Sequence, residues 1–313
     1  MPTESATSVV RRDFPWHIVV FLAPAVIVYT LVMILPLAET LRLSFFNRTP
    51  GGPEFWVGLD NFRKLFLDER WSVQFWNALW NNLYFFLIHM AVQNPIGVAL
   101  AAILSMANLP GRTFYRTAIF VPTMLSVVII GFAWKLILSP LWGVSSSMLG
   151  AVGLKWLYAP WLGKEEYALT ALSLISVWQY IGIPMMLIYA ALLNIPDEVI
   201  EAADLDGVRG PALFFKVKLP LILPSIGIIS ILTFIGNFNA FDLIYATQGS
   251  LAGPNFATDI LGTFLYRVFF GFQLQVGDPY MGSSIAAVMF LIILVGVMIY
   301  LLGIQRRMTR YQF

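Results

Sequence analysis

The sequence contains no cysteine and little charge. The absence of cysteine excludes disulfides, thiolate metal sites and cysteine nucleophiles, although it does not fix the redox compartment. Only 12% of the 313 residues are charged, against about 25% in a soluble domain, so most of the surface cannot face water. The net charge of +2 leaves no basic face to neutralise the phosphates of a nucleic acid. These absences exclude a soluble enzyme, a disordered chain and a nucleic-acid binder.

The sequence instead contains several long apolar segments. Hydrophobic residues make up 59% of the chain, and the mean hydropathy is +0.78. A membrane-spanning helix needs about 20 mostly apolar residues, and the most apolar of the long uncharged stretches give six such segments. The pattern predicts an all-α fold, an integral membrane helical bundle with six transmembrane helices. These helices are expected near residues 18–40, 80–106, 117–138, 169–193, 219–241 and 282–304.

The remaining segments complete the predicted organisation. One transmembrane domain is expected over residues 16–305, with cytoplasmic tails over residues 1–15 and 306–313. The stretch TFLYRVFFGF, within residues 243–280, is apolar but too short to cross a membrane. It is therefore expected to be an interfacial or re-entrant segment.

The distribution of Lys and Arg predicts the orientation. Six spans place both termini on one side, where ten basic residues lie in short segments close to the helices, against seven on the other side. This bias is typical of cytoplasmic segments, so both termini are expected in the cytoplasm. Aromatic residues crowd the opposite side, as an interfacial belt would: Trp71, Trp76, Trp80, Trp156, Tyr158 and Trp161.

The sequence also lacks the groups that intramembrane chemistry needs. Its only histidines are His17 and His89, and no HExxH motif or pair of intramembrane aspartates is present. His89 is expected to hydrogen-bond a neighbouring helix. The one Gly-Lys pair, Gly163-Lys164, is followed by Glu165, so the chain has no P-loop. We therefore expect no catalytic residue, no metal site and no bound cofactor, and any ATP with its Mg²⁺ would be bound by a partner subunit.

The loop between the fourth and fifth predicted spans is acidic and amphipathic. It reads NIPDEVIEAADLDGVRGPALFFKVKLPLILPS. Pro196 and three carboxylates within two turns favour a helix start, and Gly207 is placed to end the helix with a positive φ. Helices that lie on lipid headgroups favour Lys and Arg, so an acidic helix with small alanines is better suited to dock in a protein partner.

This loop resembles the EAA motif of ABC importer permeases, E-A-A-x3-G-x9-I-x-L-P. The matching residues are Glu201, Ala202, Ala203, Gly207, Val217, Leu219 and Pro220, with Val217 as a conservative departure. Within that superfamily the chain resembles the binding-protein-dependent, carbohydrate-uptake type, similar to the maltose and glycerol-phosphate permeases. Further segments carry the resemblance: FLAPAVIVYTLVMILPLAETLRLSFFN near the start, GLDNF, RTAIFVPTM, VWQYIGIPMM and NFNAFDLIY.

The resemblance implies a role for the loop and a set of partners. Residues 194–220 would form a coupling loop whose helix sits in a cleft of a cytoplasmic ATPase. Glu201 would pair with a basic group there, Ala202 and Ala203 would permit close approach, and Gly207 would make the bend. The partners would be a second homologous permease, two ATP-binding subunits and a periplasmic or extracellular solute-binding protein. The complex would lie, with surrounding lipid, in the inner membrane of a bacterial or archaeal cell.

Two predicted spans are interrupted at comparable depth, which favours a binding site there. One contains Gly182 and Pro184, and the other contains the sequence GNFNAF at residues 236–241. The resemblance to the maltose-type permease implies sugar contacts at Trp178, Ile181, Gly182, Met185, Asn237 and Ala240. Trp178 and Ala240 occupy positions that are Asn in that permease, and Met185 replaces a Tyr, so the substrate need not be the same. Gln179 and Asn239 are neighbouring candidates.

The sequence therefore predicts a permease subunit of a carbohydrate importer that works by alternating access. The main alternative is a secondary transporter or channel that works alone, but it would need buried carboxylates, and the charged candidates Glu39, Arg42, Lys135 and Asp242 lie near helix ends. An assembly protein whose loop only docks a partner is a third possibility, and an intramembrane enzyme is the least supported. The sugar stays open among a neutral mono- or disaccharide, a glycoside and an anionic derivative such as a phosphate or a sulfonate. Arg42 and Lys135 would serve an anion if they face the cavity. Segment 243–280 is expected to contact the binding protein.

Overall fold

The computed structural model of the chain describes residues 16–106, 109–273 and 275–305. The predicted tails, residues 1–15 and 306–313, lie outside these ranges. The described part is a helical bundle, and its length and composition give four helices that are apolar enough to cross a membrane. Two further pairs of helices pass the same test as bent spans. The mostly helical bundle is confirmed. The number of spans is four, or up to six if each bent pair counts as one span.

The four long helices are built from shorter segments. The first comprises α1 (Trp16–Tyr29), η1 (Thr30–Ile34) and α2 (Leu35–Leu43), and the second comprises α4 (Glu69–Ile88), η2 (His89–Gln93) and α5 (Asn94–Leu104). The third comprises α12 (Pro211–Leu213), η4 (Phe214–Lys218), α13 (Leu219–Phe238) and α14 (Asp242–Gln248), and the last comprises α16 (Pro279–Ile299) and η5 (Tyr300–Gln305).

Three of the π turns, η1, η2 and η4, have a common cause in the sequence. Each is followed, two residues after its end, by a proline: Pro36, Pro95 or Pro220. Proline has no backbone N–H to donate and its ring crowds the preceding turn. In each case the residue before the proline donates to a carbonyl five residues back, which closes a wider turn.

The second long helix begins at Glu69, well before the expected start at 80. Asp68 caps it by accepting a hydrogen bond from the backbone N–H of Arg70 at 2.9 Å. Polar residues in its first turns make this end look like a loop on a hydropathy scale. Nevertheless Trp71 and Phe75 are buried there against α15 (Leu261–Phe270) and α16.

The helix expected near 117–138 is interrupted by a sharp bend. Helices α6 (Arg112–Met124) and α7 (Val127–Ile137) meet at 97°. Leu125 and Ser126 have extended ψ angles, 146° and 130°, and Pro122 lies one turn before them. A milder bend of 41° separates α9 (Glu165–Tyr180) from α10 (Gly182–Leu193).

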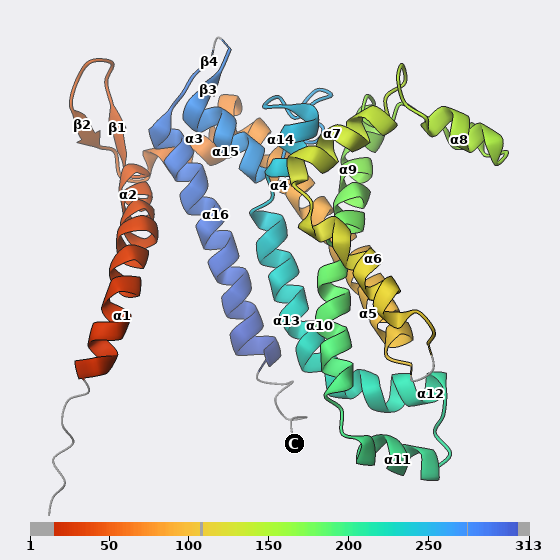
Figure 1. The fold of residues 1–313 in the computed structure, drawn as a ribbon. Coiled ribbons are helices and arrows are strands. Elements are labelled where there is room, and N and C mark those ends of the chain that lie inside the picture. Colours follow the sequence, from red (N-terminus) through yellow and green to blue (C-terminus); the bar gives the residue numbers. More distant parts are fainter. Residues whose placement is uncertain (1–15, 107–108, 274, 306–313) are drawn as a thin grey trace, which may run out of the picture.

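The remaining elements gather at the two ends of the bundle (Figure 1). At one end lie β1 (Phe46–Arg48), β2 (Glu54–Trp56), α3 (Asp60–Leu67), α8 (Ser145–Ala151), η3 (Lys155–Leu157), α15, β3 (Gly271–Phe272) and β4 (Gln275–Val276). The strands form two antiparallel hairpins, β1–β2 and β3–β4. At the opposite end lies α11 (Asp197–Leu205), on the same side as both described ends of the chain.

Three apolar clusters hold the bundle together. The first joins α4, α15 and α16, the second joins α5, α10 and α13, and the third joins α7, α9 and α14. Helix α15 contains most of the stretch that was expected to be interfacial or re-entrant. Its residues Leu261, Phe264 and Val268 are completely buried in the first cluster. It is therefore a packed helix at the end of the bundle.

Candidate functional site

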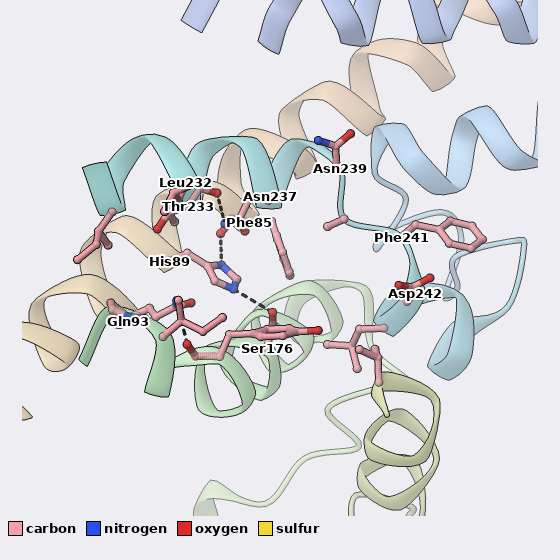
Figure 2. A pocket seen from close by; sticks show the side chains of 18 of the residues that line it. Phe85, His89, Gln93, Ser176, Leu232, Thr233, Asn237, Asn239, Phe241 and Asp242 are labelled. Carbon is pink, nitrogen blue, oxygen red and sulfur yellow. Dashed lines mark hydrogen bonds between the residues drawn. The ribbon is translucent and has the colours of Figure 1, made fainter. Parts of the chain in front are cut away.

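A cavity of about 490 Å³ lies inside the bundle (Figure 2). Its walls come from the second long helix around η2, from the bent pair α9–α10, and from α13 and α14. These are the segments that π turns, prolines and helix ends interrupt. Backbone irregularity inside a membrane bundle is tolerated where it faces protein or a polar cavity, and here it does.

Three pairs of polar residues, each four positions apart, face this cavity. Residues with that spacing lie on one face of a helix. The pairs are His89 and Gln93, Ser176 and Tyr180, and Thr233 and Asn237. Asn239, Asp242 and the rings of Phe85 and Phe241 complete much of the lining. A polyhydroxylated solute needs such amide and hydroxyl groups, with aromatic faces for its C–H surfaces.

Internal hydrogen bonds fix the orientation of the cavity side chains. His89 Nδ1 lies 2.7 Å from the carbonyl of Phe85, and Nε2 lies 3.0 Å from Ser176 Oγ (Figure 2). The expectation that His89 bonds a neighbouring helix is confirmed. Pro184 cannot donate to the carbonyl of Tyr180, and Gln93 Nε2 donates to that oxygen at 3.4 Å instead.

Two buried acceptors in the lining have unused capacity. Asn237 donates from Nδ2 to the carbonyl of Thr233 at 2.7 Å, while its Oδ1 has no hydrogen-bond partner among the described residues. Gln93 Oε1 is likewise unpaired within the described part of the chain. An unpaired buried acceptor costs about 1–3 kcal/mol. A bound hydroxyl group would recover that free energy, so both atoms are suited to accept from a ligand.

The charge of the cavity is acidic. Asp242 lines it, and none of the described lining residues is Lys or Arg. Arg42 pairs with Glu39 at 2.7 Å and with Glu54 at 3.0 Å, and Lys135 is exposed on α7. Neither cation lines the cavity, so the sequence-based option of an anion site built on them is wrong for this cavity.

The six predicted sugar contacts do not form one group in this structure. Asn237 and Ala240 line the cavity, whereas the other four, on α9, on α10 and at the joint between them, do not. Trp178 is 44% exposed and lies edge-on to the ring of Trp134, with centroids 5.6 Å apart. Ile181 is half-buried at the joint. A sugar contact at these positions stays a prediction.

Packing occupies the other two predicted positions. Met185 is completely buried in the cluster that joins α5, α10 and α13. A Cβ on Gly182 would lie 2.9 Å from Cα of Phe120, so this glycine permits a close approach of α10 to α6. The two neighbouring candidates, Asn239 and Gln179, also lie in different places. Asn239 lines the cavity, whereas Gln179 is buried outside the lining and donates to the carbonyl of Leu125 at 3.3 Å.

Sequence reasoning missed His89, Gln93, Ser176, Tyr180 and Thr233 as cavity residues. A signal for them was present in the repeated spacing of four between polar residues in otherwise apolar helices. In the sequence His89 is an isolated histidine, and Ser176 belongs to no motif. The spacing indicates a polar face, but only the packing of three helices brings the three faces together.

The acidic loop forms the expected short helix, α11, at the other end of the molecule (Figure 1). Ala203 is buried, and Val199 and Ile200 pack against the same apolar cluster as α10. The outer face carries Asp197, Glu201 and Leu205, spaced four apart. Leu205 is 90% exposed, so α11 presents an acidic and apolar surface that the described residues leave uncovered.

The end of α11 is built as its sequence predicts. Gly207 has a φ of +76°, its N–H donates to the carbonyl of Asp204, and the N–H of Val208 donates to the carbonyl of Ala203. This pair of hydrogen bonds is the Schellman arrangement, and the expected helix end is confirmed. The guanidinium of Arg209 bonds the Asp204 side chain and lowers the pKa of that carboxyl. Exposed Glu201 and Ala202 precede this end, and half-buried Val217, Leu219 and Pro220 lie in η4 and at the start of α13.

Comparisons with known proteins agree on one family. The family described as the binding-protein-dependent transport system inner membrane component matches residues 93–310. The probable ABC transporter permease protein YurN of Bacillus subtilis is 33% identical over 79% of this chain and 83% of its own length. The multiple sugar-binding transport system permease protein MsmF of Streptococcus mutans is 31% identical over 87% of this chain and 90% of its own.

Solved structures of the same architecture exist. A chain of a bacterial alginate ABC transporter, determined in complex with an alginate pentasaccharide-bound periplasmic protein, superposes with a TM-score of 0.76. The match covers 91% of this chain and 92% of that chain, at 22% sequence identity. At this identity the likeness establishes the fold.

Proposed function

The chain belongs to the family of binding-protein-dependent transport system inner membrane components, and from this membership we propose that it imports a neutral carbohydrate as one permease subunit of an ABC transporter. The observation that carries the proposal is the cavity inside the bundle, whose lining offers amide, hydroxyl and aromatic groups without a cation among the described residues. The relative named for multiple sugar-binding transport supports the substrate class.

The charge of the lining favours a neutral sugar over an acidic one. Asp242 contributes the negative charge, and Arg42 and Lys135 lie elsewhere. An anionic sugar moved from water into this cavity would lose hydration without gaining a counter-ion, which is unfavourable in a low-dielectric interior. Alginate, which the transporter with the similar fold imports, is an acidic polysaccharide, so the neutral substrate proposed for this chain would differ from it in charge.

The proposed topology has six spans, with α6–α7 and α9–α10 each counted as one. Both termini and α11 face the cytoplasm of a bacterial or archaeal cell, and α8, α15 and the two hairpins face outward. The shared end of α11 and the described termini supports this arrangement. Helix α11 is the coupling helix, and Glu201 pairs with a basic group of the ATPase.

The partners follow from the division of labour. Helix α11 presents an exposed acidic surface on which an ATPase would dock, and the sequence itself contains no P-loop with which to bind ATP. Two ATPase subunits bind ATP with Mg²⁺, a second permease completes the pathway, and a solute-binding protein delivers the sugar to the outward loops. Closure of the ATPases moves α11 and alternates the access of the cavity.

Purification of the tagged chain in mild detergent tests this function. We expect a P-loop ATPase and a second permease to co-purify, and the ATPase activity to rise with the binding protein and a neutral oligosaccharide but not with an oligouronate. Stimulation by the oligouronate alone would overturn the neutral substrate class. A solitary chain that moves sugar in vesicles would instead identify a secondary transporter.

A further inference from the structure

The outward end of the chain contains a loop that is held unusually firmly. Residues 249–260 connect α14 to α15. Arg267 of α15 lies under this loop with only 2% of its side chain exposed, and it pairs with the equally buried Asp259 at 2.6 Å. The same guanidinium donates to the carbonyl of Ser250 at 2.9 Å and to Gln74 Oε1 at 3.3 Å. The loop is therefore fixed at both of its ends by one cation.

Helix α4 holds the same loop from the other side. Asn77 Nδ2 donates to the carbonyl of Phe256 at 2.9 Å. Asn81 Nδ2 donates to the carbonyls of Ala257 and Asp259 at 3.2 and 2.9 Å. Side-chain amides thus satisfy backbone acceptors that a loop cannot pair with a helix or sheet partner, and the loop has a defined shape before any partner arrives.

Asn82, the next residue of α4, connects this loop to the cavity. It is completely buried. Its Oδ1 accepts from the backbone N–H of Leu261, at the start of α15, at 3.3 Å. Its Nδ2 donates to the carbonyl of Asn237, near the end of α13, at 3.1 Å. The N–H of Leu261 is in the first turn of α15 and has no intrahelical acceptor, whereas the carbonyl of Asn237 also accepts from the N–H of Ala240 at 3.2 Å. One amide therefore joins the ends of two helices.

Asn237 is also one of the two cavity residues, with Gln93, whose buried acceptor is unpaired among the described residues. Its backbone carbonyl binds Asn82 while its side chain faces the cavity. A displacement of α15 relative to α4 would therefore act on Asn237 through two direct hydrogen bonds.

We propose that Asn82 is a positioning residue that couples the outward loop 249–260 to the cavity wall at Asn237. When a solute-binding protein engages this loop, Asn82 transmits the displacement to the end of α13 and sets the cavity for the incoming sugar. The inference rests on the proposed function, since it assigns the loop to the binding protein. Asn81 and Arg267 shape the loop, whereas Asn82 alone among these three contacts the cavity wall.

Two leucine substitutions at neighbouring positions separate the roles. In the reconstituted transporter, Asn82→Leu should reduce the maximal ATPase stimulation by about fivefold or more, a typical allosteric coupling, with the half-saturating concentration of binding protein within about twofold of wild type. Asn81→Leu is the matched control. It cuts only loop contacts and should raise that concentration while the maximal stimulation is preserved. Full stimulation of Asn82→Leu would overturn the proposal, and so would an equal fall of its basal and stimulated activity.

Hydrogen exchange of the full chain in lipid nanodiscs tests the same coupling without a ligand. Arg267→Met should speed amide exchange in residues 249–260 and, through Asn82, in residues 236–241. In the Asn82→Leu background the added effect at 236–241 should disappear, which is the signature of a coupled pair in a double-mutant cycle. Additive effects would refute the connection. If wild type shows no stimulation by a binding protein, the proposed function fails, while the exchange measurement still decides the role of Asn82.

Discussion

At the scale of single residues, Asn237 combines three contacts that sequence alone does not separate. Its carbonyl accepts from Asn82 and from the N–H of Ala240, its Nδ2 donates to Thr233, and its Oδ1 is left for the cavity. The side chain is only 6% exposed. Its free acceptor is therefore shielded from bulk water. A hydrogen bond to a ligand is stronger in such a low-dielectric site than in water.

Asn237→Ala should weaken sugar transport while assembly is preserved. The substitution removes one acceptor for a sugar hydroxyl, worth about 1 kcal/mol, so the half-saturating sugar concentration should rise roughly fivefold to tenfold. Asn239→Ala is the matched control. Asn239 borders the same cavity, but its side chain is exposed, donates to the carbonyl of Ile235 and points away from His89 and Asn237 in Figure 2. Uptake kinetics measured for both variants check this. Unchanged kinetics for Asn237→Ala would remove it from the site.

At the scale of elements, α11 is a short helix whose two faces have different tasks. One face, with Ala203 and Val199, packs on the bundle, and the other presents Glu201 and Leu205. Because Leu205 is 90% exposed, a change there does not disturb the core. A coupling surface and a folding surface are thus separable on one helix.

Glu201→Lys should abolish sugar-stimulated ATPase activity while membrane insertion is unchanged. The reversed charge would face the basic group proposed in the ATPase cleft, where like charges repel. Leu205→Asp should release the ATPase from the purified complex, because it removes the apolar part of the same contact. Glu165→Lys, the same charge change at the exposed start of α9, should leave both properties as in wild type. Normal stimulated activity of Glu201→Lys would refute the coupling role.

The elements also indicate what sequence can and cannot predict. The acidic helix and its glycine end were predictable, because capping and positive-φ glycine act over a few residues. The start of α4 at Glu69 was not, because Glu69, Arg70 and Asn77 lower the hydropathy of its first turns, and Asn77 finds its partner, the carbonyl of Phe256, far along the chain. The cavity required the packing of three helices, which no local pattern contains.

At the scale of the whole molecule, the exposed apolar surface indicates that the helices are surrounded by the hydrocarbon of a membrane. The helix Ile18–Leu43 has 26 residues, and none of the residues in its most apolar 18-residue stretch is buried. In water such a surface would drive aggregation, whereas hydrocarbon solvates it and the helix satisfies its own backbone groups. Many of the buried polar residues lie instead around the cavity and under loop 249–260, where they are kept from the apolar outer surface.

The proposed orientation of the whole molecule predicts the accessibility of its two ends. The sequence has no cysteine, so a thiol reagent labels only the single cysteine that is introduced. In right-side-out vesicles that contain the chain alone, an impermeant maleimide should label Glu165→Cys directly and Asp206→Cys only after permeabilisation. Both positions are exposed, and using the chain alone prevents an ATPase from masking Asp206. Labelling of Asp206→Cys in sealed vesicles would place α11 outside the cell, where no ATPase reaches it, and the importer mechanism would fail with the topology.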